Sequence, residues 1–162
     1  TNFKIKNYKS KIIIKKLNVL YQNYDKTDWI PYANFNENKY TRNLVHRNDL
    51  FQIVLMCWPK KFISPIHDHN KSECLYKILK GELIETIYQK NNNKLIEIEK
   101  FQLIKNEVGS INDNYGVHKV FNPNDDYCVS LHLYVPAYDK TDIYHLDNDN
   151  KFKIETVHLH FD

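Results

Sequence analysis

The chain has 162 residues, which suits one domain, and its 42% hydrophobic and 14% aromatic content predicts a folded core rather than a disordered chain. The formal net charge at pH 7 is only +3. The lysines of the first sixteen residues lack the aromatic or arginine platforms of nucleic-acid surfaces, so no nucleic-acid partner is expected. No apolar run reaches the length that a bilayer requires and no signal peptide is recognised, so we expect a cytoplasmic protein without a membrane partner.

The first predicted element is an amphipathic helix over residues 9–24, because apolar side chains recur there at helical spacing, at Ile13, Leu17, Leu20 and Tyr21. Residues 29–32 form either another helical turn or a loop. From residue 39 onward, short runs of β-branched and aromatic residues alternate with turn formers. Strands are predicted over residues 40–46, 50–58, 63–69, 73–80, 82–90, 94–104, 108–111, 116–122, 127–135 and 152–161.

Two asparagine-rich segments, 91–93 and 122–126, are each predicted to form a hairpin tip between strands. No long helical pattern separates the strands, which disfavours a parallel sheet and favours an antiparallel sandwich or barrel. The expected fold class is mainly β, a jelly-roll barrel or sandwich of the cupin type with a short N-terminal helical segment. We expect a single domain, with residues 1–38 as a helical cap and residues 39–162 as the barrel.

The pair His67 and His69 is the strongest chemical signal in the chain. On an extended segment, side chains two residues apart point to the same face, so both imidazoles can reach one metal ion. A third donor is needed, and His118, in a Gly-Val-His segment, is the natural candidate. Three histidines suit a first-row divalent ion. Zinc would imply hydrolytic chemistry, whereas Fe(II) would supply an electron to dioxygen.

Residues 127–135 are predicted to form a strand with two different faces. One face is an apolar stripe, and the other carries Cys128, Ser130, His132 and Tyr134. The polar face either points to solvent or forms a hydrogen-bonded relay, Ser130–His132–Tyr134, directed at a substrate. Cys74 by itself is expected to be a small buried apolar residue, and the three cysteines (Cys57, Cys74 and Cys128) are expected to stay reduced.

Taken together, these residues resemble the cysteine dioxygenases, a family of thiol dioxygenases in the cupin superfamily. The resemblance runs in family order over about residues 39–160. It is carried by Lys39–Val45, Met56–Trp58, Ile66–His69, Cys74 with Gly81–Thr86, Ile111–Asp113, Gly116–His118 and Ser130–Tyr134.

The resemblance implies mononuclear Fe(II) held by His67, His69 and His118, without a carboxylate ligand. The implied substrates are L-cysteine, bound through its thiolate and amine, and O2, and the implied product is cysteine sulfinic acid. Arg42 matches the residue that binds the substrate carboxylate, a task that suits a planar guanidinium. The other matches are a supporting tyrosine (Tyr40), a thioether crosslink between Cys74 and Tyr134, a relay behind that tyrosine (Ser130 and His132), and a tryptophan packed near the crosslink (Trp58).

The chain departs from some relatives at Thr141, which stands where they carry a pocket cysteine, so the fine shape of the substrate pocket is open. Alternatives to the cysteine reaction are oxidation of another small thiol acid, such as 3-mercaptopropionate, and a cupin that binds a metal or ligand without catalysis. A zinc hydrolase is disfavoured because no general base is obvious. A monomer is expected from the resemblance.

Overall fold

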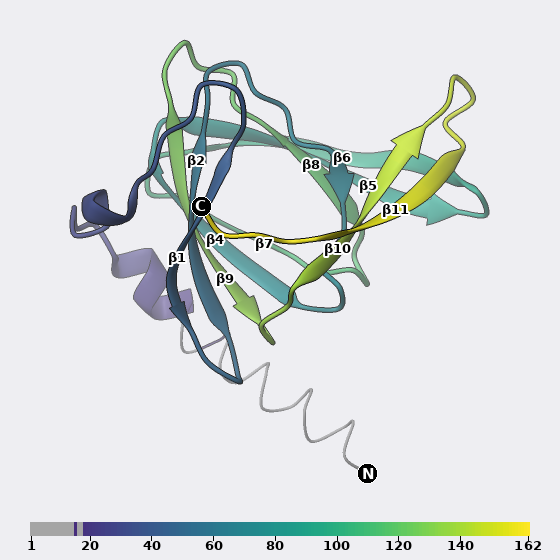
Figure 1. Ribbon diagram of the computed structural model, residues 1–162. Coiled ribbons are helices and arrows are strands. Elements are labelled where there is room, and N and C mark those ends of the chain that lie inside the picture. Colours follow the sequence, from purple (N-terminus) through teal and green to yellow (C-terminus); the bar gives the residue numbers. More distant parts are fainter. Residues whose placement is uncertain (1–14, 16–17) are drawn as a thin grey trace.

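The protein is described from a computed structural model that covers residue 15 and residues 18–162 (Figure 1). Its described part contains two antiparallel sheets that face each other, with strand orders β1-β2-β9-β4-β7 and β11-β10-β3-β8-β5-β6. The strands are β1 (Thr41–Arg47), β2 (Gln52–Trp58), β3 (Ile66–His67), β4 (Glu73–Lys80), β5 (Glu82–Asn91), β6 (Lys94–Ile104), β7 (Val108–Ile111), β8 (Val117–Phe121), β9 (Cys128–Val135), β10 (Lys140–Leu146) and β11 (Phe152–His158).

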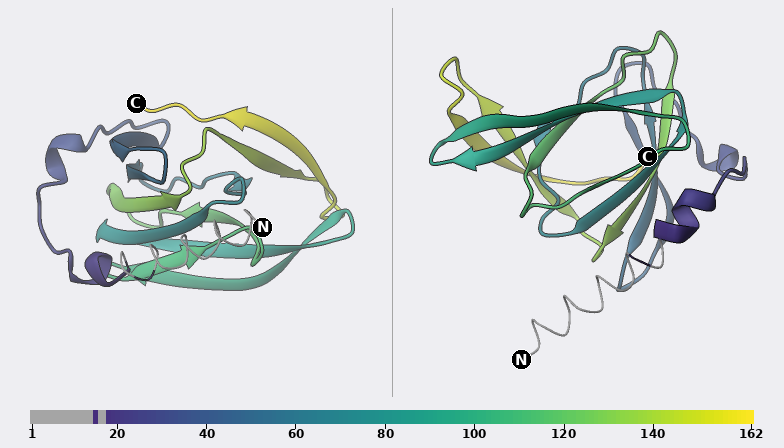
Figure 2. Two further views of the ribbon diagram at one scale, coloured as in Figure 1. Left: turned by 90° about the horizontal axis from the view of Figure 1, so that it is seen from below. Right: turned by 180° about the vertical axis from the view of Figure 1, so that it is seen from behind.

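The five-stranded sheet is buried on both faces, which explains the almost continuous burial along β2 and β9. Its inner face contributes Met56, Trp58 and Tyr134 to the main core between the sheets. Its outer face packs against an N-terminal segment, residues 18–33, which Figures 1 and 2 show beside this sheet. Tyr21 contacts the cluster around Leu133 there. The N-terminal segment therefore covers apolar surface that the barrel would otherwise expose.

A buried lysine attaches this N-terminal segment to the barrel. The Nζ atom of Lys77, on β4, donates hydrogen bonds to the backbone oxygens of Gln22 (3.0 Å) and Tyr24 (2.5 Å). Gln22 lies in the last turn of the helical residues 18–23, and Tyr24 follows directly after them. At the C-terminal end of a helix, backbone carbonyls lack hydrogen-bond partners within the helix. The lysine thus supplies hydrogen-bond donors to carbonyls at the C-terminal end of the helix, and it also holds the helix against the sheet.

The predicted helix is confirmed where the structure describes it, since residues 15 and 18–23 are helical. Ile13 and Leu17 lie outside the described residues. Of the two remaining apolar positions, Tyr21 is buried but Leu20 is 65% exposed, so the apolar face is narrower than predicted. Residues 30–32 form a single 3-10 turn, η1 (Ile30–Tyr32). Within the described residues, no helix is both long and apolar enough to cross a membrane.

The structure corrects three of the predicted β elements. The strand predicted over residues 63–69 is shorter in the structure, where β3 spans only Ile66–His67. Residues 122–126 do not close a hairpin, because they connect β8 in one sheet to β9 in the other. Strand β10 was missed, because its start, Lys140-Thr141-Asp142, is polar and resembles a turn. In the structure β10 pairs with both β3 and β11, so ladder hydrogen bonds outweigh the weak local pattern.

Candidate metal centre

Three histidines from two separate segments meet inside the barrel. His67 on β3 and His118 on β8 are register partners in the six-stranded sheet. His69 follows two residues later, beyond the end of β3, so the pair does not lie on one regular strand as predicted. The ring centroids nevertheless lie only 4.6 to 5.3 Å apart, and one ligand atom of each histidine lies within 4.8 Å of the other two. The predicted three-histidine cluster is therefore present.

Hydrogen bonds on the outer nitrogens fix how two of these rings present their inner nitrogens. Nδ1 of His67 lies 3.0 Å from the backbone oxygen of Pro65, and Nδ1 of His118 contacts a carboxylate oxygen of Glu85. Both partners are acceptors, so each Nδ1 donates a proton to its partner, and the neutral form of each ring has a lone pair on Nε2. The two Nε2 atoms lie 3.2 Å apart. Lone pairs that face each other at this distance repel, and a cation bound by both removes the repulsion, so the donor set fits a metal ion.

The third histidine is held by a carboxylate in the loop before β8. Asp113 accepts a hydrogen bond from the backbone N–H of His69 at 2.8 Å, and its Oδ1 lies 3.7 Å from Nδ1 of the ring. Burial is the main cause that lowers the pKa of both His67 and His69, and the neighbouring His118 lowers both further. Low pKa values favour neutral imidazoles at neutral pH, which is the form that binds metals.

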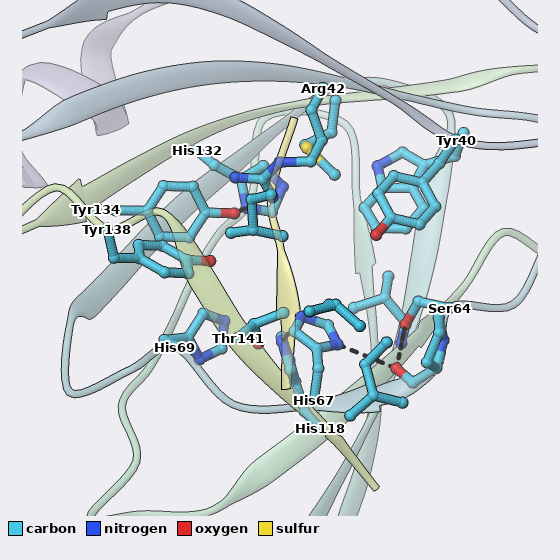
Figure 3. Close-up of a pocket in the computed structure, with 17 residues that line it drawn as sticks. Tyr40, Arg42, Ser64, His67, His69, His118, His132, Tyr134, Tyr138 and Thr141 are labelled. Carbon is cyan, nitrogen blue, oxygen red and sulfur yellow. Dashed lines mark hydrogen bonds between the residues drawn. The ribbon is translucent and has the colours of Figure 1, made fainter. Parts of the chain in front are cut away.

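A cavity opens beside the histidines, and Figure 3 shows Arg42 on its opposite side. The phenols of Tyr134 and Tyr138 lie along one flank, and Tyr40 lies on the other. Arg42 is buried, and its Nε and Nη2 atoms have no hydrogen-bond partner among the described residues. A buried guanidinium with two free donors is costly unless an anion binds it. The cavity therefore combines a metal-binding cluster with a site for a carboxylate.

The polar row of β9 is buried rather than exposed to solvent, and two of its members, His132 and Tyr134, line this cavity. Ser130 Oγ lies 2.8 Å from Nε2 of His132, and Nδ1 of the same ring lies 3.2 Å from the Tyr134 hydroxyl. Trp58 donates from Nε1 to Ser130 Oγ at 2.8 Å, which ties the far end of the row to β2. Cys74 is the register partner of Tyr134 across β4 and β9.

The remaining predicted pocket residues also line the cavity. Tyr40 lies just before β1, not on it, and stacks on Trp58 with ring centroids 5.2 Å apart. Thr141 lines the cavity from β10, and its hydroxyl donates to the backbone oxygen of Asp68 at 2.7 Å. This hydrogen bond links β10 to the segment between the two metal-site histidines.

Sequence reasoning missed three buried polar residues around the site. Glu85 and Tyr76 form a hydrogen-bonded chain with His118, and Tyr138 lines the cavity with its ring 5.0 Å from that of Tyr134. The local sequence gives one signal that Glu85 is buried: it lies between an isoleucine and a threonine on a half-buried strand. Tyr76 and Tyr138 have no such signal, because their neighbours in space come from other strands.

The class of protein follows from this geometry: a jelly-roll barrel is a cupin fold, and here it carries three inward histidines that could hold a metal ion. Solved structures share the fold. A cupin superfamily protein from Desulfitobacterium hafniense aligns over 65% of this chain and 84% of its own, with a TM-score of 0.52 at 17% identity. A protein from Thermus thermophilus aligns over 70% of this chain and 98% of its own, with a TM-score of 0.57 at 18% identity.

The family model described as cysteine dioxygenase type I matches residues 7–147. Human cysteine dioxygenase type 1 is 37% identical over 143 residues, which cover 85% of this chain and 72% of the human protein. The cysteine dioxygenase type 1 of Bos taurus is 38% identical over 140 residues, 83% of this chain and 70% of the bovine protein. The chain belongs to the cysteine dioxygenase type I family, and it is an enzyme of that family.

Proposed function

We propose that the protein uses Fe(II) to oxidise L-cysteine with O2 to cysteine sulfinic acid. The observation that carries this proposal is the buried guanidinium of Arg42, which lies in the same cavity as the three histidines and whose Nε and Nη2 atoms have no hydrogen-bond partner among the described residues. Membership of the family supports the reaction class. The overall change adds both oxygen atoms of O2 to the sulfur of RSH to form RSO2H, so atoms balance without a further reductant.

The charge of the cavity suits this substrate. His67, His69 and His118 are neutral ligands, so they leave the charge of a bound divalent ion uncancelled. The described residues that line the cavity include Arg42 but no aspartate or glutamate. An anionic thiolate and a carboxylate are therefore both favoured there, and a carboxylate general base for hydrolysis is missing from the lining. When bound, iron supplies the redox chemistry that activates O2.

In this proposal, the protein holds the substrate at both of its ends. Arg42 binds the carboxylate through its two free donors, a paired contact that fixes orientation as well as charge. The amine and thiolate would then face the three histidines, which lie across the cavity from Arg42 in Figure 3. Tyr134 lies between the two ends, with Arg42 Cζ 5.7 Å from its ring centroid. Its hydroxyl is oriented by His132, so it can hydrogen-bond the substrate without reorganisation.

Cys74 and Tyr134 are proposed to form a thioether. The sulfur of Cys74 lies 3.8 Å from Nδ1 of His132, and the hydroxyl of Tyr134 lies 3.2 Å from the same atom. Bond formation breaks the S–H bond of Cys74 and one ring C–H bond of Tyr134, and O2 takes up the two protons and two electrons released and becomes hydrogen peroxide. The crosslink would fix the phenol of Tyr134 beside the metal site, since a covalent bond removes its rotamer freedom.

The test is to load the metal-free protein with Fe(II) and measure O2 uptake and cysteine sulfinate in the same sample. We expect one O2 consumed for each sulfinate formed, and both oxygen atoms of labelled O2 in the product. The ratio of kcat/KM for cysteine and 3-mercaptopropionate decides between the two thiol acids. Protein loaded with Zn(II) is the control, and we expect it to be inactive. A lack of turnover for every small thiol acid would contradict the proposed reaction.

A further inference from the structure

A buried glutamate on β5 sits behind one of the metal-site histidines. Glu85 is 1% exposed. One of its carboxylate oxygens accepts from Nδ1 of His118, and the other accepts from the hydroxyl of Tyr76. Both partners are themselves only 2% exposed. The carboxylate is thus desolvated and hydrogen-bonded on both sides, which is the condition under which a buried charge is tolerated. The proposed reaction assigns it no task.

Tyr76 connects this glutamate to the opposite sheet. In the register of the five-stranded sheet, Tyr76 on β4 lies between His132 on β9 and Gly109 on β7. Its ring stacks on that of His132, with centroids 5.1 Å apart and planes 13° apart. A Cβ atom at Gly109 would lie 2.4 Å from the phenol ring, so the tyrosine fits only because this position is glycine. The phenol is therefore held in place from both sides.

The phenol can act only as a donor to the carboxylate. Burial, followed by the charge of Glu85, raises the pKa of Tyr76 well above its usual value, so the hydroxyl keeps its proton. The resulting chain runs from Tyr76 to Glu85 to His118, and it joins the metal-site histidine to the ring that stacks on His132. Hydrogen bonds on the far nitrogen of a metal-binding imidazole change its strength as a ligand.

We propose that Tyr76 and Glu85 are a pair of positioning residues that set how strongly His118 binds the metal. Glu85 holds the proton on Nδ1, aims Nε2 at the metal and increases the electron density on the ring. Tyr76 opposes this increase in electron density, because the hydrogen bond that its hydroxyl donates stabilises part of the negative charge of the carboxylate. The inference rests on the proposed function only in taking iron as the metal.

Two substitutions separate these opposing effects. Glu85→Gln keeps the shape of the side chain and removes its charge, so we expect Fe(II) affinity to fall about 10- to 100-fold. The same change should raise the reduction potential of the bound iron, because less negative charge remains to stabilise Fe(III). Tyr76→Phe keeps the stacked ring and leaves the full charge on Glu85, so we expect the reduction potential to fall. A residue that served only to fill space would not produce shifts of opposite sign.

The experiment titrates metal-free protein anaerobically with Fe(II) against a chromogenic chelator, and then measures the reduction potential with mediator dyes. Tyr115→Phe and Glu99→Gln are the matched controls, because Tyr115 donates to Glu99 at 2.6 Å in the same kind of pair on the protein surface. Both controls should retain wild-type values.

Unchanged Fe(II) affinity in Glu85→Gln, or a potential that does not fall in Tyr76→Phe, would overturn the proposal. If Glu85→Gln does not fold, the direction of the potential in the isosteric Tyr76→Phe variant still decides. No thiol is present in either measurement. A wild-type protein that binds Fe(II) but oxidises no thiol would therefore contradict the proposed function and leave this inference intact.

Discussion

Cys74 and Tyr134 lie directly opposite each other on β4 and β9. Register partners in an antiparallel pair point to the same face, with Cβ atoms about 4.5–5.5 Å apart. Both side chains are buried in the main core, at 2% and 3% exposure, so solvent cannot compete for either group. This relationship brings an oxidisable sulfur next to a phenol that lines the same cavity as the three histidines, and a mass measurement can test whether the two are joined.

The first prediction concerns the thioether. Protein exposed to Fe(II), cysteine and O2 should contain a species lighter than the sequence mass by two hydrogen atoms, because bond formation removes one from each partner. Intact-mass spectrometry checks this, and peptide mapping should join the segments around Cys74 and Tyr134. Cys74→Ser should show the full mass only. Cys57→Ser, which alters a buried cysteine outside the cavity, should still show the lighter species.

The second prediction concerns Arg42. Hydrogen bonds to a charged group contribute about 1.5–3 kcal/mol, so Arg42→Ala should raise KM for cysteine about 10- to 100-fold. Iron content should change little, because the guanidinium lies across the cavity from the histidines. Steady-state kinetics and metal analysis on the same preparation measure both. Arg47→Ala is the control, since Arg47 is the second arginine of the chain and pairs with Asp139 at the surface. Equal KM values in the two variants would remove the role assigned to Arg42.

The metal cluster was predictable because its signal is local. His67 and His69 share one short segment, and His118 follows a glycine that marks a close approach of backbones: a Cβ atom at Gly116 would lie 2.5 Å from the Tyr88 oxygen. Alternation likewise predicted most strands of the barrel. The polar row of β9 could be recognised as a row, but only the second sheet shows that it faces inward.

The errors arise where structure depends on distant partners. Residues 122–126 have the composition of a hairpin tip, yet the strands on either side join different sheets. Strand β10 has a polar start and is held by ladders to β3 and β11, which no local pattern encodes. The local sequence gives only one signal for the burial of Glu85, its isoleucine and threonine neighbours. Its burial follows from Tyr76 and His118, which lie on other strands.

The third prediction is that His118→Ala loses most of the bound metal. A three-ligand site has no spare donor, and the loss also leaves the carboxylate of Glu85 without one of its two partners. Metal analysis after gel filtration measures the content, and circular dichroism checks the fold. His145→Ala is the control, because His145 is exposed and pairs only with Glu155 among the described residues. Full metal content in His118→Ala would place the site elsewhere.

The fourth prediction concerns the pH dependence of stability. Burial, followed by the charge of Arg42, holds the pKa of His132 well below its usual value. The folded protein therefore keeps this ring neutral, whereas the unfolded chain takes up a proton near pH 6.5. Below that pH the unfolded state binds more protons, so the free energy of unfolding falls by up to about 1.4 kcal/mol per pH unit from this residue. Above about pH 7.5 neither state is protonated, and the contribution to the slope vanishes.

His132→Gln should therefore flatten the decline in the free energy of unfolding of the metal-free protein between about pH 6.5 and 5. His67 and His69 also have lowered pKa values, so part of the slope must remain in the variant. Urea unfolding of metal-free protein at half-unit pH steps measures the slope, and His145→Gln, at an exposed position, should reproduce the wild-type curve. A slope in His132→Gln equal to that of the wild type would mean that the ring is protonated in the folded protein. Both ring nitrogens of His132 would then donate, to Ser130 Oγ and to the Tyr134 hydroxyl, and the ring could accept a hydrogen bond from neither.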